Sequence, residues 1–170
     1  RILHARAYIT SCGIYEAWIN GKRVGNQLLT PGTTSYKKRI QYHTYDITGQ
    51  IKIGENAVGI ALGDGWFRGS NGMRSHCNIF GINIALLCQI EIYTDKDCIY
   101  VISDSGWYAT QKGPIRYNDL KHGEVYDARM EIPGWADIGF DAADWHHPSH
   151  FDWDYGALIG SNSVPIIEQE

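Results

Sequence analysis

Apolar and polar residues alternate in short runs along much of the chain. The runs that show this alternation cover residues 5–10, 14–20, 40–47, 57–62, 82–93 and 98–103. Because successive side chains of a strand point to opposite faces, a period of two predicts half-buried β-strands. Residues that favour turns separate the runs, and Asn20-Gly21 is a strong signal for a hairpin because both residues tolerate positive φ.

The longest run, residues 82–93, predicts a long strand that a turn at Asp95-Lys96 joins to the strand at 98–103. The expected register of this hairpin pairs Ile92 with Ile99, Ile90 with Val101 and Cys88 with Ser103. One apolar face should therefore continue across both strands. The same register separates Cys88 from Cys98, which disfavours a local disulfide.

The remaining segments have no clear period. Residues 63–81 are polar and rich in glycine, and a loop of that length in a compact domain is usually functional or disordered. Beyond Trp107 the chain is irregular, with a short strand predicted at 126–131 and at most one helical turn, capped by Asp141. Many short strands and almost no helix predict an all-β fold, an antiparallel sandwich or jelly roll.

Length and composition indicate one globular domain. The chain has 170 residues, of which 44% are hydrophobic, and we expect a single domain over 1–160. Residues 161–170 resemble a linker or the first strand of a following domain. The lack of an initial Met and of a signal peptide suggests an excised piece. The compartment stays open, with a cytoplasmic location favoured over secretion.

Charge and hydropathy exclude some partners. The net charge is −4 and no basic cluster exceeds Lys37-Lys38-Arg39, so we expect neither a nucleic-acid partner nor an anionic membrane surface. No apolar run approaches the roughly 20 residues of a membrane span. The four cysteines form no C-x-x-C pair, so we expect free thiols.

The residues give little support for catalysis or for a metal site. Eight scattered carboxylates could supply the acid and base of a glycosidase, although solvated turn caps explain them better: Asp64, Glu124, Asp127, Asp137, Asp141, Asp144, Asp152 and Asp154. A histidine-rich segment has metal-binding residue types, but a solvated tail is the simpler interpretation: His146, His147, His150, Asp152 and Asp154. We predict no catalytic residue, no metal ligand and no cofactor.

A sugar contact is the more informative hypothesis. Sugars stack their C–H faces on aromatic rings and exchange hydrogen bonds with polar side chains. The predicted loop combines both kinds of residue, namely Asp64, Trp66, Arg68 and Asn71. In the alternative interpretation, Trp66 plugs one end of the sandwich and Arg68 pairs with an acid.

The order of short motifs resembles the N-terminal domain of bacterial α-L-rhamnosidases over nearly the whole chain. The matching segments are residues 5–10, 13–16, 20–25, 31–33, 36–39, 42–48, 54–56, 62–69, 123–129, 133–135, 140–141 and 144–145. One Asn-Gly-Lys turn is weak evidence, since many sandwich domains of glycosidases share it, whereas the combined order is specific.

The resemblance implies a jelly-roll β-sandwich, galactose-binding-domain-like and similar to carbohydrate-binding modules. In glycoside hydrolase family 78 the catalytic carboxylates lie in a separate C-terminal (α/α)6 barrel. Some relatives bind rhamnose through calcium in this domain, but residues 31–36 offer no carboxylate. We therefore carry no calcium site over to this chain.

The resemblance implies a non-catalytic accessory domain that supports the catalytic barrel of the same polypeptide. Recognition of a rhamnoside substrate is a second role that the resemblance allows for this domain. The alternatives are an autonomous carbohydrate-binding module and a purely structural scaffold.

A second charged motif, Glu124, Asp127 and Arg129, should lie near residues 63–69 and brace the sheet or contact a sugar. Bracing predicts that Arg68 or Arg129 is at least half buried and bonded to a carboxylate. Sugar binding predicts that Trp66 is exposed and lines a pocket.

Overall fold

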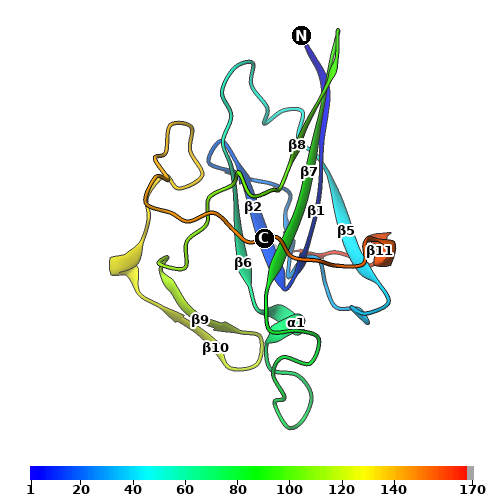
Figure 1. Cartoon of the computed structure of the whole chain (residues 1–170), viewed down its shortest axis with the longest axis vertical. Coiled ribbons are helices and arrows are strands. Elements are labelled where there is room, and N and C mark those ends of the chain that lie inside the picture. The colour runs from blue at the N-terminus through cyan, green and yellow to red at the C-terminus, as the bar shows by residue number, and fades with distance from the viewer. Residues whose placement is uncertain (168–170) are drawn as a thin grey trace.

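The computed structural model describes residues 1–167, which form two facing β-sheets with long connections. In spatial order, the larger sheet contains five strands: β11 (Leu158–Gly160), β5 (Ile40–Asp46), β1 (Ile2–Cys12), β7 (Ala85–Thr94) and β8 (Cys98–Ile102). All neighbours are antiparallel except β11 and β5 (Figure 1).

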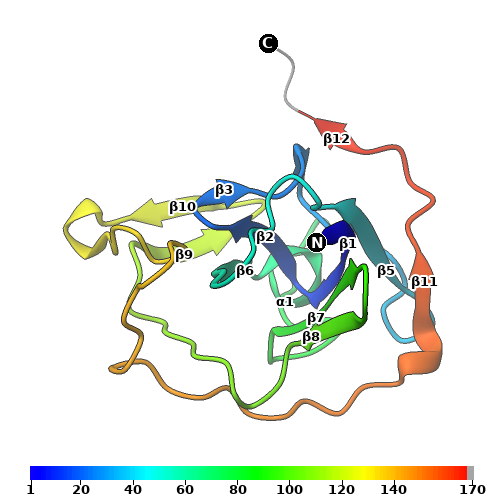
Figure 2. The same ribbon diagram turned by 90° about the horizontal axis from the view of Figure 1, so that it is seen from above.

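The facing sheet has three strands, β3 (Lys22–Arg23), β2 (Ile14–Ile19) and β6 (Val58–Gly63). Seen from above, β2 and β6 face β1 and β7 across the core (Figure 2). This arrangement confirms the predicted all-β antiparallel sandwich.

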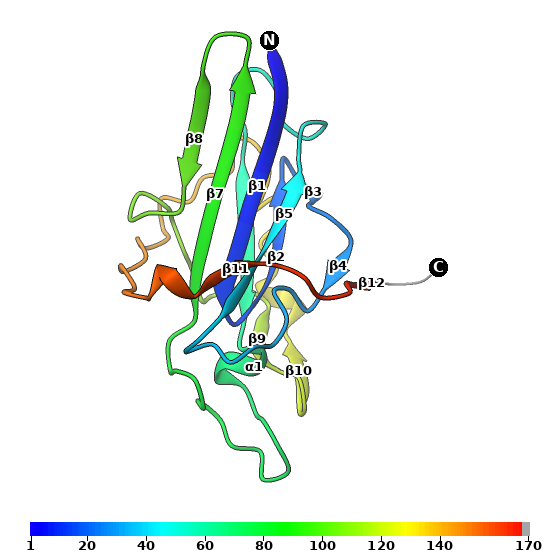
Figure 3. The same ribbon diagram turned by 90° about the vertical axis from the view of Figure 1, so that its right-hand side faces the viewer.

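Smaller elements surround the two sheets. They are β4 (Gln27–Leu28), α1 (Gly65–Arg68), β9 (Ile115–Asp119), β10 (Gly123–Tyr126), the 3-10 turns η1 (Ala128–Met130) and η2 (Tyr155–Ala157), and β12 (Ile166–Ile167). The β9–β10 hairpin forms a ribbon of its own at the same end of the sandwich as α1 (Figure 3). None of the described helices is long and apolar enough to cross a membrane.

The β7–β8 hairpin has the predicted register. Ile92 pairs with Ile99 and Ile90 with Val101, although β7 begins at Ala85 rather than at residue 82. Ile90 is buried, whereas Ile99 remains 50% exposed at the sheet edge. The predicted apolar face thus continues across the hairpin, but it is only partly buried at β8, since the facing sheet has three strands against five.

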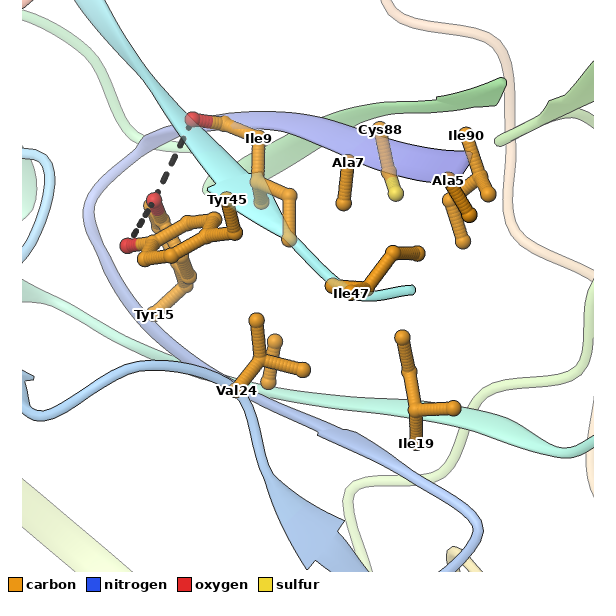
Figure 4. Packing of buried hydrophobic residues seen from close by; sticks show 11 residues of the cluster. Ala5, Ala7, Ile9, Tyr15, Ile19, Val24, Tyr45, Ile47, Cys88 and Ile90 are labelled. Atoms are coloured by element: carbon orange, nitrogen blue, oxygen red, sulfur yellow. Dashed lines mark hydrogen bonds between the residues drawn. The ribbon is translucent and has the colours of Figure 1, made fainter. Parts of the chain in front are cut away.

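The main core lies between the two sheets (Figure 4). Alternate residues of β1, β2 and β7 meet there with Val24 and Ile47, as the period of two requires. The hydroxyl of Tyr15 donates to the Ile9 carbonyl at 3.2 Å and lies 3.0 Å from the Tyr45 hydroxyl. Burial raises the pKa of Tyr15, so the phenol stays neutral and serves as a hydrogen-bonding group inside the core.

A second apolar cluster attaches α1 to the sandwich. Phe67 of α1 is fully buried, 5.2 Å from the ring of Tyr36 and 5.8 Å from that of Trp153. Cys12 and Ile40 complete the buried part of this cluster. Segments from four parts of the chain therefore hold the position of α1.

Several local predictions were wrong. The predicted loop at 63–81 contains the helical turn α1, because Phe67 supplies an apolar anchor for it. Residues 126–131 do not form the predicted strand. β10 ends at Tyr126, and the 3-10 turn η1 follows because the Asp127 side chain accepts from the Arg129 amide and caps it. The cap predicted at Asp141 is present, since Asp141 accepts from the Ala143 amide at 2.9 Å, and a single turn follows it.

The cysteines and the C-terminal segment complete the fold. Cys12, Cys77, Cys88 and Cys98 are all free thiols. β12 pairs with β4 of the same domain, with Ile166 opposite Leu28. The rest of the predicted terminal linker, 168–170, lies outside the described residues.

Candidate functional site

The first predicted motif lies on α1 and the turn that follows it. Gly65 begins the helical turn with φ of +53°, and a Cβ there would lie 2.6 Å from the Ile14 side chain. Glycine is therefore required where β6 turns into α1. This turn places Asp64, Trp66 and Arg68 on a fixed backbone at one end of the sandwich.

Arg68 pairs with Asp64 inside this turn. Its Nε donates to Asp64 Oδ1 at 2.8 Å, and the side chains are 35% and 27% exposed respectively. Arg68 is thus more than half buried and bonded to a carboxylate, as the bracing interpretation predicts. The pair joins two residues of one helical turn, however, and does not connect the two charged motifs.

The other polar group of this motif is also engaged locally. Asn71 Nδ2 donates to the Trp66 carbonyl at 2.7 Å and to the Gly69 carbonyl at 3.1 Å. The Trp66 side chain is partly buried and packs against the cluster around Phe67. The four predicted sugar-contact residues therefore lie together and form a closed local network, and their role in sugar binding stays a prediction.

The buried carboxylate of Asp119 connects the β9–β10 hairpin to the α1 segment, and the Lys121 ammonium adds a bond to the Gly72 carbonyl at 2.7 Å. The Asp119 carboxylate is buried and accepts from the backbone amides of Ser70 at 2.7 Å, Lys121 at 2.9 Å and His122 at 3.0 Å. Burial opposes ionisation, but these hydrogen bonds outweigh it and lower the pKa of Asp119 to about 2. Asp119 was not among the predicted site residues, although an Asp just before a turn is a typical Asx-turn signal.

The second predicted motif reaches the first only at one end. Glu124 lies opposite Asn118 in the hairpin, and Asn118 lies beside Gly63 of the first motif. A Cβ added at Gly63 would be 2.9 Å from Asn118 Oδ1. Asp127 and Arg129 pair with each other at 2.7 Å, which lowers the pKa of Asp127, and the Arg129 side chain is 88% exposed. The two motifs are neighbours through β9. Arg129 pairs with a residue of its own motif, and its role in bracing stays a prediction.

The β9–β10 hairpin leaves an apolar face uncovered. Val125 lies opposite Tyr117, and beyond them a bulge at Arg116 shifts the register so that Ile115 pairs with Tyr126. These side chains are 45% to 55% exposed: Ile115, Tyr117 and Val125. Asn118 and Glu124, the adjoining pair of the ribbon, lie on the opposite face. A ribbon of two strands thus presents an apolar side and a polar side.

Two clefts lie away from the predicted sites. The larger, of about 530 Å³, lies between residues 110–116 and 144–146 and is lined by Lys112, Arg116, Asp144 and Trp145. The smaller, of about 230 Å³, is apolar and lies between Ile53 and Ile99. Trp66 lines neither of them, so the pocket expected beside its indole is not at these positions.

The chain matches the model of the family described as "Alpha-L-rhamnosidase N-terminal domain" over residues 1–170. An α-L-rhamnosidase of Streptomyces avermitilis is 43% identical over 146 residues, 85% of this chain and 14% of that protein. One from Formosa agariphila is 40% identical and covers 85% of this chain and 16% of its own length.

Solved structures of the same class superpose closely. The S. avermitilis α-L-rhamnosidase complexed with L-rhamnose has a TM-score of 0.94 at 38% identity, covering 100% of this chain and 16% of that one. The native enzyme from Aspergillus terreus has a TM-score of 0.93 at 37% identity, covering 96% and 19%. The chain therefore belongs to the family of α-L-rhamnosidase N-terminal domains.

Proposed function

We propose that the chain is a non-catalytic accessory domain that supports the catalytic part of a longer α-L-rhamnosidase. The chain spans 14% to 16% of the curated relatives it matches, which leaves several hundred residues for the reaction. The uncovered apolar face of the β9–β10 hairpin carries the proposal, since it gives the domain a surface for the rest of the polypeptide.

The physical argument concerns the stability of a ribbon. A hairpin of two strands is at best marginally stable in water without a third strand or a packing partner. Here Asp119 fixes one end on the Ser70 amide, while Tyr117 and Val125 remain about half exposed. Contiguous apolar residues on a protein surface mark interaction sites. Packing of this face against the remainder of the polypeptide would stabilise both partners.

An activity assay tests the non-catalytic part of the proposal. Inverting glycosidases need two carboxyl groups about 6.5–9.5 Å apart across a cleft. We expect the 170-residue chain alone to release no phenol from an aryl α-L-rhamnoside, whereas the whole enzyme does. Turnover by the purified chain that is lost when one of its own carboxylates is replaced would refute this.

Surface variants test the docking part. Tyr117→Ser and Val125→Ser should lower the melting temperature of the whole enzyme by several degrees and leave that of the 170-residue chain nearly unchanged. Met73→Ser is the matched control, because Met73 is 99% exposed and belongs to the loop after α1 rather than to the hairpin. Equal small effects of all three substitutions on the whole enzyme would contradict docking through this face.

A further inference from the structure

The larger cleft has a built framework. Its two walls, residues 110–116 and 144–146, are joined where Ala109 and His146 exchange backbone hydrogen bonds of 2.8 and 3.1 Å. The cleft volume of about 530 Å³ lies in the range of small-molecule sites. Both walls therefore hold their spacing without help from a ligand.

One wall presents two cations that have no acidic partner. Arg116 Nη1 donates to the carbonyls of Gln111 at 2.8 Å and Gly113 at 2.9 Å, which fixes the guanidinium above this turn. Within residues 1–167, neither Arg116 nor Lys112 has a carboxylate within 4.0 Å. Asp127, whose carboxylate is hydrogen-bonded to Arg129, interacts electrostatically with Arg116 without forming an ion pair with it.

The opposite wall presents an aromatic ring and hydrogen-bonding groups. Trp145 is partly buried, and its ring meets that of Phe140 edge to face at 5.4 Å, so its position is set by packing. Asp144 adjoins it, and Thr110 lies on the other wall. An indole next to polar side chains suits the C–H faces and hydroxyls of a sugar ring.

We infer that this cleft binds an acidic saccharide, with the sugar ring against Trp145 and its carboxylate at Arg116 and Lys112. Two unpaired cations against the single carboxylate of Asp144 make the cleft locally positive in a chain of net charge −4. An anionic ligand is thereby favoured over a neutral one. Guanidinium groups bind carboxylates through paired hydrogen bonds, which adds specificity to the charge.

The inference goes beyond the proposed accessory role and does not depend on it. The lining of the cleft includes neither Tyr117 nor Val125, the two opposed residues of the apolar face that we propose for docking. Loss of saccharide binding and loss of docking are therefore separately measurable.

A titration of the 170-residue chain followed by NMR tests the inference. The probes are D-galacturonate, D-galactose and acetate, which separate an acidic sugar from a neutral sugar and from a simple anion. The six tryptophans give separate indole signals, and Trp145→Phe identifies the one in the cleft. We expect galacturonate to shift this signal at about millimolar concentration, at least tenfold below the concentrations needed for the other two probes.

Substitutions decide whether the cleft residues are responsible. Arg116→Gln and Trp145→Ala should each weaken galacturonate binding at least tenfold, and Arg116→Lys should restore part of it. Arg74→Gln, at an exposed site outside the cleft, is the control and should change nothing. An unchanged indole signal, equal binding of galactose or acetate, or undiminished binding by folded Arg116→Gln would each overturn the inference.

Discussion

Replacement of Asp119 tests how the β9–β10 hairpin is held on the sandwich. The carboxylate is 6% exposed and accepts from the amides of Ser70, Lys121 and His122. Asp119→Ala removes the acceptor and leaves all three amide groups without it. A buried donor left without a partner costs about 1–3 kcal/mol, whereas a donor near the surface can turn to water.

The expected magnitude follows from the position of each amide. Lys121 and His122 are exposed residues of the hairpin turn, so their amides regain water at small cost. Ser70 is partly buried beneath the hairpin, and its amide should bear most of the loss. We therefore expect Asp119→Ala to lower the free energy of unfolding by about 2 kcal/mol, which corresponds to roughly 4–8 °C in melting temperature.

The dependence on pH gives a second measurement. The pKa of Asp119 is lowered to about 2 in the folded chain, against about 3.9 for an unfolded aspartate. The stabilisation by the ionised carboxylate is therefore complete above about pH 4 and is lost as the pH falls towards 2. Asp119→Asn should remove this part of the acid sensitivity.

Urea unfolding followed by tryptophan fluorescence, between about pH 2 and 7, measures both effects. The control is Asp152→Asn, since the Asp152 side chain is 100% exposed. Hydrogen exchange should also show faster exchange of the Ser70 amide in Asp119→Ala. A loss below about 0.5 kcal/mol, no larger than that of the control, would refute the argument that Asp119 anchors the hairpin.

Two further predictions concern packing and thiol chemistry. Gly59→Ala should destabilise the chain by about 1–3 kcal/mol, because the new Cβ would lie 2.6 Å from the Trp135 ring, and Gly49→Ala, with no atom within 4 Å, should not. Equal melting temperatures of the two variants would contradict this. Burial raises the pKa of Cys12 and Cys88 to about 12, so a thiol reagent should label exposed Cys77 first and these two only on unfolding. Labelling of all four cysteines at one rate would be inconsistent with the fold.

The register of the β7–β8 hairpin was predictable because its signal is local. A strand of alternating apolar residues has one face that must be buried, and a slip by one residue would expose all of it. Ile90 opposite Val101 therefore follows from the sequence between them. The reduced burial of Val101, which is 37% exposed, depends on the width of the facing sheet, a property of other segments.

The candidate sites were less predictable because their partners are distant in sequence. Asp119 and the Ser70 amide are 49 residues apart, and no pattern around either residue indicates the other. Arg68, by contrast, pairs with Asp64 four residues earlier, as the spacing of a helical turn allows. The sequence predicted an acidic partner for Arg68 without naming it, because residues 63–81 were expected to form a loop. Both the Asp64 partner and the anchoring carboxylate required the fold.

The single short strand β9 contributes to two different surfaces. Tyr117 lies opposite Val125 on the uncovered apolar side, and Arg116, the bulged residue beside it, lines the cleft together with Trp145. Asp119 fixes the strand end on the Ser70 amide, so both surfaces keep their orientation relative to α1. A substitution at Tyr117 should therefore change docking without changing the cleft, and one at Arg116 should do the reverse. Loosening the hairpin at Asp119 should weaken both together, because both surfaces include residues of the strand that Asp119 ends.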